Sequence, residues 1–152
     1  MTSGLPRVVL VGKANGGMSK TTELLFDTNA LVDIYRGQVS IKAHFELILD
    51  GSLMPYVSVI TEGELWRGLR PDELERHELL LSQFISLPVD SDAARLAGTL
   101  MHKYANSGLG WMDALISATG KVADLPVLTR DKRLVDVLSS ETNYELYSLV
   151  GP

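Results

Sequence analysis

A chain of 152 residues, 45% of them hydrophobic, is long enough for one globular domain with a core of its own. It has no cysteine, which excludes disulfides, cysteine-ligated zinc and a thiol nucleophile, and it has no apolar run long enough to cross a membrane, so we expect a cytoplasmic protein. The formal net charge of −5 argues against a simple cationic nucleic-acid binder, but it is compatible with a nucleic-acid enzyme whose carboxylates hold metal ions.

The first 22 residues differ from the rest of the chain. Residues 1–22 are rich in small and polar side chains, and we expect an N-terminal extension that is flexible or partly dispensable. A glycine-rich stretch that resembles a phosphate-binding loop covers residues 16–22 (GGMSKTT). Such a loop needs glycine directly before its lysine and a helix directly after it. Ser19 precedes Lys20 and a strand-like run follows, so we do not expect nucleotide binding.

Short apolar runs rich in β-branched residues predict buried parallel strands, each followed by a helical pattern. The clearest predicted strands cover residues 24–26, 56–60 and 127–129, and weaker candidates cover 86–89 and 145–149. Helical patterns cover residues 28–36, 40–49, 61–69, 72–85, 92–106 and 111–123, and a short helix follows Asp131. This alternation predicts an α/β fold: a three-layer α/β/α domain over residues 23–150, with a central parallel sheet of four to five strands.

Residue types at the predicted helix ends support these boundaries. Gly37 and Gly51 follow the first two predicted helices, as is common at helix C-termini. Pro71 favours the first turn of the helix predicted from residue 72. Ser91 is the predicted N-cap of the helix that starts at residue 92.

Four carboxylates stand in apolar surroundings. Asp27 directly follows the predicted strand 24–26, Glu64 comes shortly after strand 56–60, and Asp131 comes shortly after strand 127–129. The fourth, Asp113, opens an otherwise apolar helix that should pack on the sheet. Each acid alone is explained by helix capping or by solvation. Together they predict one site, because open α/β sheets bind ligands at the carboxyl ends of their strands.

A site built from four carboxylates requires a cation or protonation. Like charges about 4 Å apart repel by about 4 kcal/mol per pair at an effective dielectric constant of 20. No cysteine is present and no histidine pair lies near these acids, so every ligand would be an oxygen. Oxygen ligands favour Mg²⁺, or Mn²⁺ in its place, over zinc.

Four motifs in this order resemble the PIN-domain ribonucleases, and most of all the VapC toxins of bacterial and archaeal toxin–antitoxin pairs. They are DTN at residues 27–29, VSVITEGEL at 57–65, MDALISA at 112–118 and LTRD at 128–131. The resemblance covers about residues 23–150 and implies a PIN-like fold. It also implies a Mg²⁺-dependent endoribonuclease that hydrolyses RNA phosphodiesters and acts as the toxin of a type II pair. The partners implied are RNA, a VapB-like antitoxin and a second copy of the chain in a homodimer.

Carried over by position, the resemblance assigns roles to six residues. The family's metal-binding acids fall on Asp27, Glu64, Asp113 and Asp131, and its hydroxyl and amide helpers fall on Thr129 and Asn29. Glu62 competes with Glu64 for the second position, and we prefer Glu64 because it stands three residues after Thr61, as in the family pattern. Leu134 stands where relatives commonly have phenylalanine, which we interpret as a packing variation.

Other side chains are candidates for binding the partners. Arginines close to the acid motifs could contact RNA phosphates, namely Arg67, Arg130 and Arg133, whereas Arg70 and Lys132 are expected to be ordinary solvated cations. Apolar residues on the two helices after Asp27 are expected to be mostly core, and some could form a groove for an antitoxin helix: Ile34, Tyr35, Ile41, Phe45 and Leu49.

Three alternatives stay open at this point. A haloacid-dehalogenase-like phosphatase would need a second aspartate two residues after Asp27, and Asn29 stands there instead. A non-catalytic PIN-like interaction module would not be expected to keep all four acids. A housekeeping PIN nuclease for RNA processing differs from a toxin in its target, and only the small size of the chain favours the toxin.

Overall fold

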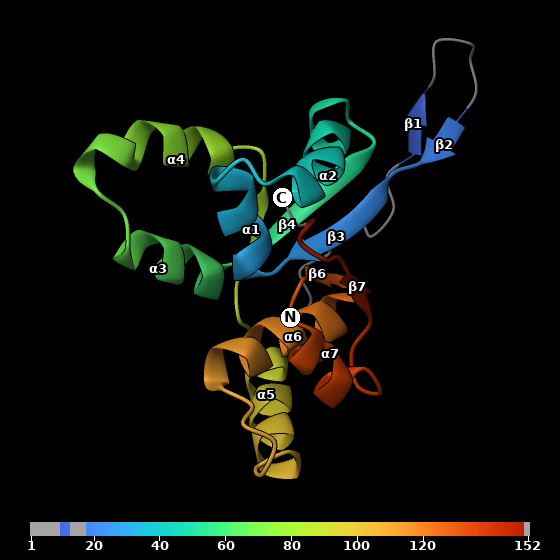
Figure 1. Ribbon diagram of the computed structural model, residues 1–152. Helices are drawn as coiled ribbons and strands as arrows, with labels where there is room; N and C mark the ends of the chain where they lie inside the picture. Colours follow the sequence, from blue (N-terminus) through green and yellow to red (C-terminus); the bar gives the residue numbers. More distant parts are fainter. Residues whose placement is uncertain (1–9, 13–17, 151–152) are drawn as a thin grey trace.

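The computed structural model describes residues 10–12 and 18–150 and is built on a five-stranded sheet (Figure 1). The strands are β3 (Thr22–Phe26), β4 (Leu53–Ser58), β5 (Ile85–Leu87), β6 (Val127–Thr129) and β7 (Tyr144–Leu146). They lie in the order β5-β4-β3-β6-β7, and every neighbouring pair is parallel. The predicted parallel sheet is confirmed.

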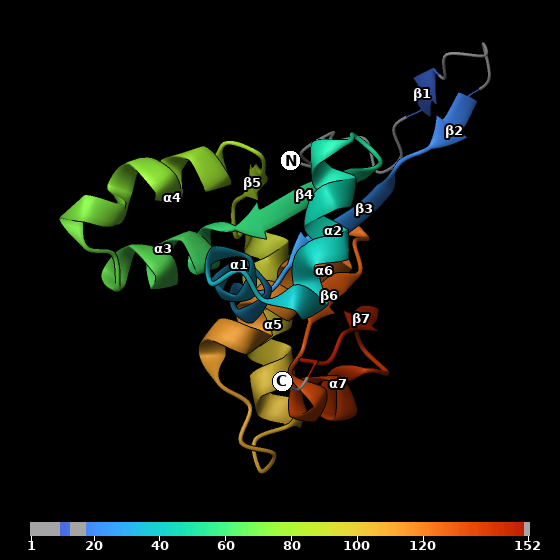
Figure 2. The same cartoon turned by 45° about the horizontal axis from the view of Figure 1, so that its top comes forward.

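Helices cover both faces of this sheet (Figures 1 and 2). One layer contains α1 (Thr28–Tyr35) and α2 (Val39–Leu49), which pack on the sheet. From the same side, α3 (Val59–Arg67) and α4 (Leu74–Leu81) project away from the sheet, joined by a short 3₁₀ turn (Pro71–Glu73). The other layer contains α5 (Ser91–Lys103), α6 (Trp111–Ala123) and α7 (Lys132–Leu138). The three-layer α/β/α architecture is therefore confirmed.

The two faces of the sheet carry separate cores because successive strand residues point to opposite sides. Leu24, Phe26 and Val57 pack with the α1–α2 layer, where the Phe26 and Phe84 rings meet edge to face at 5.2 Å between centroids. Leu25 and Val127 point the other way and pack with α6. Burial on both faces explains why the strands appear in the sequence as continuous apolar runs.

Small residues allow the helices of the second layer to approach one another and the sheet. Ala93 and Ala97 of α5 meet Ala114 and Ala118 of α6, and all four are buried. At Gly120 of α6, a β-carbon would lie only 2.7 Å from Val127 Cγ2 and 3.0 Å from the carbonyl oxygen of Leu125. Glycine at this position therefore sets how closely α6 approaches β6.

Several predicted boundaries were wrong in detail. The strand predicted over residues 56–60 ends at Ser58, whose hydroxyl accepts a hydrogen bond from the Ile60 amide and starts α3. Asp90, not Ser91, caps α5, because its carboxylate accepts a hydrogen bond from the Ala93 amide at 2.8 Å. The helix predicted over residues 72–85 begins as a 3₁₀ turn and ends at Leu81.

The N-terminal region is described only in part. Its two short strands, β1 (Leu10–Gly12) and β2 (Met18–Lys20), pair antiparallel apart from the main sheet. Residues 1–9 and 13–17 lie outside the described residues, so the expectation of a flexible or dispensable extension over 1–22 stays a prediction. Across the described residues no helix combines the length and the apolar character needed to span a membrane.

Candidate active site

The order of the strands explains why distant acids meet. Strand β3 lies at the centre of the sheet, between β4 and β6. After β3 the chain adds β4 and β5 on one side, and it then crosses to the other side to add β6 and β7. A parallel sheet opens a crevice at such a point, beyond the carboxyl ends of its strands. Asp27 directly follows β3, Glu64 lies in the helix that follows β4, and Asp131 lies just beyond β6. The topology therefore places these three acids beyond the carboxyl ends of adjacent strands.

Asp27 is held in a buried position directly after β3. Only 4% of the residue is exposed, and its carboxylate caps α1 by accepting a hydrogen bond from the Thr28 amide at 2.8 Å. Its other oxygen accepts from the Thr129 hydroxyl at 2.7 Å. Burial raises the pKa of Asp27; these two hydrogen bonds oppose the rise, and the charges of Glu64 and Asp131 add to it.

Thr129 connects β6 to Asp27 and to Asp131. Its hydroxyl donates its only hydrogen to Asp27 and accepts from the Asp131 amide at 3.1 Å and from the Asn29 side-chain amide at 3.3 Å. The side-chain oxygen of Asn29, Oδ1, in turn accepts from the Arg130 backbone amide at 3.4 Å. Asp131 caps α7 by accepting from the Leu134 amide. Thr129 and Asn29 thus hold acids and backbone in place, the positions at which the resemblance put the helper groups.

Thr28 holds Glu64 and is itself held by Thr61, two threonines that the sequence alone did not assign to the site. The Thr28 hydroxyl donates to the Glu64 carboxylate at 2.6 Å, and the hydroxyls of Thr28 and Thr61 lie 2.9 Å apart. Since Thr28 has one hydroxyl hydrogen and gives it to Glu64, the Thr61 hydroxyl is the donor in the second bond. The signal that could have found Thr28 was its position directly after Asp27, at the first residue of α1.

Glu62 and Glu64 point in different directions. Glu62 accepts a hydrogen bond from the Ser86 hydroxyl of β5 and so faces the outermost strand of the sheet. Glu64 faces Thr28 and contributes to the raised pKa values of Asp27 and Asp113. Of the two glutamates, the structure brings Glu64 to the other acids.

Asp113 belongs to the opposite helical layer and lines a pocket together with Asp131. It is the third residue of α6 and is partly buried. Burial raises the pKa of Asp113 to about 6, with further contributions from the negative charges of Asp27, Asp131 and Glu64. Asp113 therefore lies within electrostatic range of the other three acids, and it lines a pocket together with Asp131.

The donor set suits a hard divalent cation, although the acids are not arranged around one. Within the part of the chain that the structure describes, no three acidic or histidine side chains form a group that could enclose a metal ion. The four candidate donors are all carboxylate oxygens, and their mutual repulsion is what raises the pKa of Asp113 beyond the effect of burial. These residues therefore fit Mg²⁺ by chemistry and by uncompensated charge.

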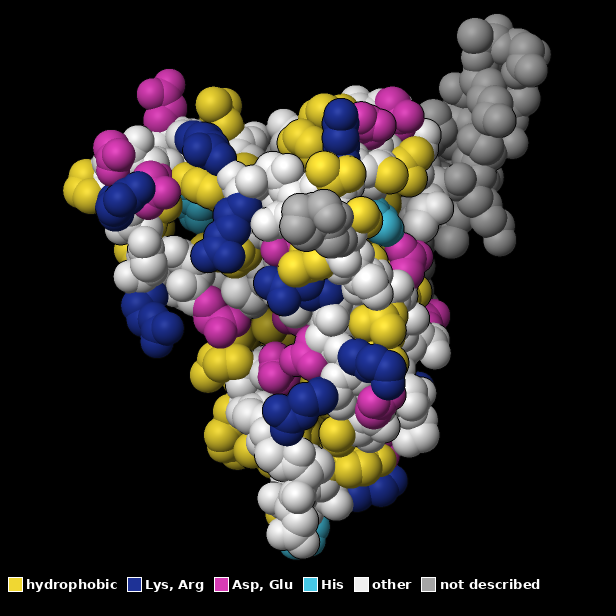
Figure 3. Space-filling view, in the orientation of Figure 1, with side chains coloured by type: hydrophobic (Ala, Val, Ile, Leu, Met, Phe, Trp, Pro, Cys, Tyr) yellow, Lys and Arg dark blue, Asp and Glu magenta, His cyan; other side chains and the backbone are white. Residues whose placement is uncertain are grey.

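Most of the basic side chains around the acids have ionic partners. Arg130 donates to the buried carboxylate of Asp33 at 2.7 Å, and Lys132 pairs with Asp136 at 3.1 Å. Arg70 pairs with acids of the following turn, Asp72 and Glu73. Arg130 is thus an ion-pair residue rather than the free phosphate-binding cation suggested by the sequence. Figure 3 shows acidic side chains gathered at the centre of one face, with Lys or Arg side chains above and below them.

Comparison with known protein families identifies the family to which this chain belongs. A model of the PIN domain matches residues 24–138, which include all four acids. The chain belongs to the PIN-domain family. Its curated relatives include Ribonuclease VapC19 of Mycobacterium tuberculosis, 32% identical over 72% of this chain and 89% of that protein. Ribonuclease VapC10 of the same organism is 35% identical over 70% of this chain and 80% of its own length.

Solved PIN-domain structures share the fold. A toxin–antitoxin complex from Klebsiella pneumoniae contains a chain that is 26% identical, with a TM-score of 0.65 over 80% of this chain and 95% of that one. DNA-bound VapBC from Salmonella typhimurium contains a chain that is also 26% identical, with a TM-score of 0.69 over 82% of this chain and 98% of that one. The resemblance to VapC-type PIN domains predicted from the four motifs is therefore confirmed.

Proposed function

We propose that this PIN-domain protein is a Mg²⁺-dependent endoribonuclease that hydrolyses RNA phosphodiesters as the toxin of a toxin–antitoxin pair. The observation that supports the proposal is that Asp27, Glu64 and Asp131 follow the carboxyl ends of neighbouring strands, and that their charges act on Asp113 from the opposite helical layer. The relatives named ribonuclease support RNA as the substrate.

The four carboxylates would hold the ion, with Mn²⁺ as a substitute. When bound, a divalent cation lowers the pKa of water and neutralises charge on the phosphoryl oxygens. The chain itself supplies rigid positions: Thr129 and the Thr28 amide fix Asp27, and the Thr28 hydroxyl fixes Glu64. Asp113 lacks such a bond among the interactions described, so its carboxylate is the one that can adjust when the ion and substrate enter.

The proposed protein partner is a VapB-like antitoxin, and the proposed assembly is a homodimer. Support for the first comes from solved relatives that are toxin–antitoxin complexes. An uncovered apolar surface on the projecting helices is available for a partner: Trp66 of α3 and Leu74 and Leu79 of α4 are exposed. Ile41, one of the groove candidates, is buried in the core. Co-purification with the product of an adjacent gene tests this partner.

Substitutions of Asp27 and Glu64 test the nuclease, with Glu62 on the same helix as Glu64 providing the matched control. Asp27→Asn and Glu64→Gln should each lower Mg²⁺-dependent RNA cleavage by at least about 10³-fold, because each removes a proposed metal-binding charge. Glu62→Gln, two residues away and bonded to Ser86, should retain cleavage. The measurement is cleavage of a labelled RNA by purified protein with Mg²⁺ or with EDTA, together with growth after induced expression. Equal growth and equal cleavage for wild type and Asp27→Asn would contradict the proposal.

The same RNA-cleavage and growth assays distinguish the proposed toxin from the alternative functions. A non-catalytic module would bind a partner without cleaving RNA in any metal. A housekeeping nuclease would cleave RNA without arresting growth. Membership of the PIN family favours a nuclease over the haloacid-dehalogenase-like phosphatase.

A further inference from the structure

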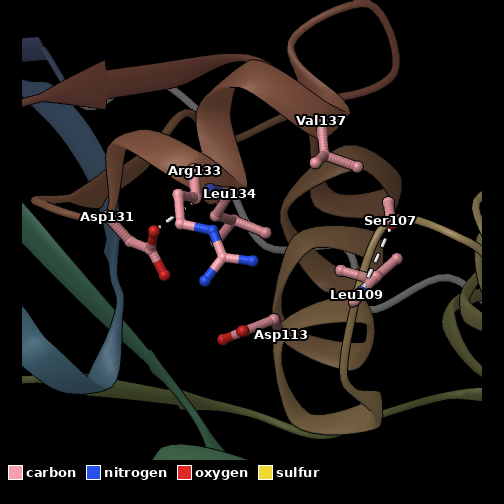
Figure 4. A pocket seen from close by; sticks show the side chains of 8 residues that line it. Ser107, Leu109, Asp113, Asp131, Arg133, Leu134 and Val137 are labelled. Carbon is pink, nitrogen blue, oxygen red and sulfur yellow. Dashed lines mark hydrogen bonds between the residues drawn. The ribbon is translucent and has the colours of Figure 1, made fainter.

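A small pocket opens beside the acidic site, between α6, α7 and the loop that precedes α6. Asp113 and Asp131 line one side, and Arg133 projects into it from α7 (Figure 4). The remaining lining residues are Ser107, Gly108, Leu109, Leu134 and Val137. The pocket therefore joins two of the proposed catalytic acids to one cation.

Arg133 differs from the neighbouring basic residues because it has no ion-pair partner among the described residues. Arg130 is held by Asp33, and Lys132 by Asp136. In the described part of the chain, the Arg133 guanidinium makes no hydrogen bond or ion pair, although Figure 4 shows it directed toward the space that Asp113 and Asp131 face. A guanidinium presents five donors in a planar fork that matches phosphate oxygens.

The loop opposite Arg133 leaves room for a ligand. Gly108 has a φ of +82°. The heavy atom nearest to a β-carbon placed there would be Nη2 of Arg133, 3.5 Å away. No side chain at position 108 therefore covers the guanidinium, and the apolar side chains of Leu109, Leu134 and Val137 complete the lining.

We propose that Arg133 binds a backbone phosphate of single-stranded RNA in this pocket and so positions the chain of the substrate next to the four acids. The inference rests on the proposed nuclease function and adds to it the residue that holds the substrate. Arg133 is a positioning residue here: its guanidinium contacts a phosphate beside the reacting bond and takes no part in proton transfer. Arg130 and Lys132 do not share this role because each is paired with a carboxylate.

Binding measured without cleavage tests the proposal. Variants are made in the Asp27→Asn background, and the affinity for a short fluorescein-labelled single-stranded RNA is followed by anisotropy with Mg²⁺ over a range of salt concentrations. Arg133→Ala should weaken binding about tenfold and should reduce the salt slope by about 0.7, the value for one phosphate contact on a single strand. Arg133→Lys should keep the slope while losing part of the affinity, because it keeps the charge without the fork. Lys132→Ala is the matched control and should change neither.

A second pair of variants leaves Arg133 in place. Gly108→Asp puts a carboxylate beside the guanidinium, and Gly108→Asn puts an uncharged side chain of the same size there. Asp and Asn tolerate the positive φ similarly, so the strain is the same in both. Gly108→Asp should lower the affinity for RNA and its salt slope, as Arg133→Ala does. Gly108→Asn should keep the salt slope of the Asp27→Asn protein.

The outcomes separate the inference from the function on which it rests. If the wild type cleaves RNA but Arg133→Ala matches Lys132→Ala in affinity and salt slope, the phosphate-binding role is wrong and the nuclease stands. Equal slopes for Gly108→Asp and Gly108→Asn would overturn that role independently. If the wild type neither cleaves nor binds RNA, the proposed function fails and the inference falls with it.

Discussion

Thr28 shows how one residue can serve two acids of the site. Its amide donates to the carboxylate of Asp27, which caps α1, and its hydroxyl donates to Glu64. A polar side chain at the first position of a helix is ordinary, but here the hydroxyl points across to another element instead of back to its own helix. Because Thr61 supplies the second hydrogen bond, the hydroxyl is oriented before any substrate arrives.

We expect Thr28→Val to lower the rate of RNA cleavage by about tenfold or more, because Glu64 loses the group that orients it. Thr28→Ser keeps the hydroxyl and should retain most of the rate. Both variants keep the backbone amide that bonds to Asp27. Single-turnover cleavage rates compare the two, and equal rates for the valine and serine variants would show that this hydroxyl does not matter.

The raised pKa of Asp113 predicts that the free energy of unfolding depends on pH. Its pKa is raised from 3.8 to about 6 in the folded protein, first by burial and then by Asp27, Asp131 and Glu64. Between these two values the folded state binds the proton more tightly than the unfolded state, so the contribution of Asp113 to stability falls as pH rises. Above the higher value the ionised side chain destabilises the metal-free fold.

Asp113→Asn should therefore raise the melting temperature in EDTA at pH 7 by about 3 °C, and the gain should shrink as the pH falls from about 6 to 3.8, the folded and unfolded pKa values of Asp113. Adding Mg²⁺ should stabilise the wild type more than the variant, because the ion would compensate the charges. Thermal unfolding at several pH values measures both effects. A variant less stable than the wild type at pH 7 in EDTA would show that repulsion is not the dominant effect.

At the scale of elements, the contact between α6 and β6 depends on one glycine. A β-carbon at Gly120 would overlap Val127 and press on a backbone oxygen, whereas one at Gly98 of α5 would have no heavy atom within 4 Å. The same substitution should therefore have opposite effects in the two helices. The helix-forming advantage of alanine acts at both positions, but at Gly120 the steric cost exceeds it.

Gly120→Ala should lower the free energy of unfolding by about 2 kcal/mol, and Gly98→Ala should raise it by about 0.5 kcal/mol. Urea unfolding of the two variants measures the difference. Adding Val127→Ala, which removes the overlapping methyl group, should cost less in the Gly120→Ala background than in the wild type. Strict additivity of these two changes would count against the close approach.

At the scale of the whole molecule, an ion pair with one fully buried partner connects three distant parts of the chain. Asp33 of α1, only 1% exposed, accepts hydrogen bonds from Arg130 after β6 and from the Tyr147 hydroxyl after β7. The Tyr147 amide also donates to the Thr129 carbonyl. The turn that carries Thr129 and Asp131 is therefore anchored on both sides, which helps to keep the edge of the crevice rigid.

Arg130→Gln should lower the free energy of unfolding by about 3 kcal/mol, because it leaves the Asp33 carboxylate buried without its cation. Lys132→Gln removes an exposed pair with Asp136 and should change stability by no more than about 0.5 kcal/mol. Chemical unfolding compares the two neighbours directly. Similar small losses for both would mean that Tyr147 alone satisfies Asp33.

The sequence by itself determined the layers of this protein and the identity of its candidate acids. Apolar runs such as that ending at Phe26 predict buried parallel strands because both sheet faces are covered, and an acid directly after such a run has few positions other than the sheet edge. The end of β4 could not be predicted well, because Val59 and Ile60 have the side chains of a strand while Ser58 caps a helix.

Only the tertiary structure decided which neighbours the acids have. The strand order places β4 and β6 on either side of β3, and that order depends on contacts between residues far apart in the chain. The choice between Glu62 and Glu64 depended on the direction in which α3 leaves the sheet. Arg130 and Arg133 look alike in the sequence, but a buried carboxylate in α1 pairs with the first and none pairs with the second within the described chain. Local patterns determine which groups are present, whereas packing over long distances determines which of them meet.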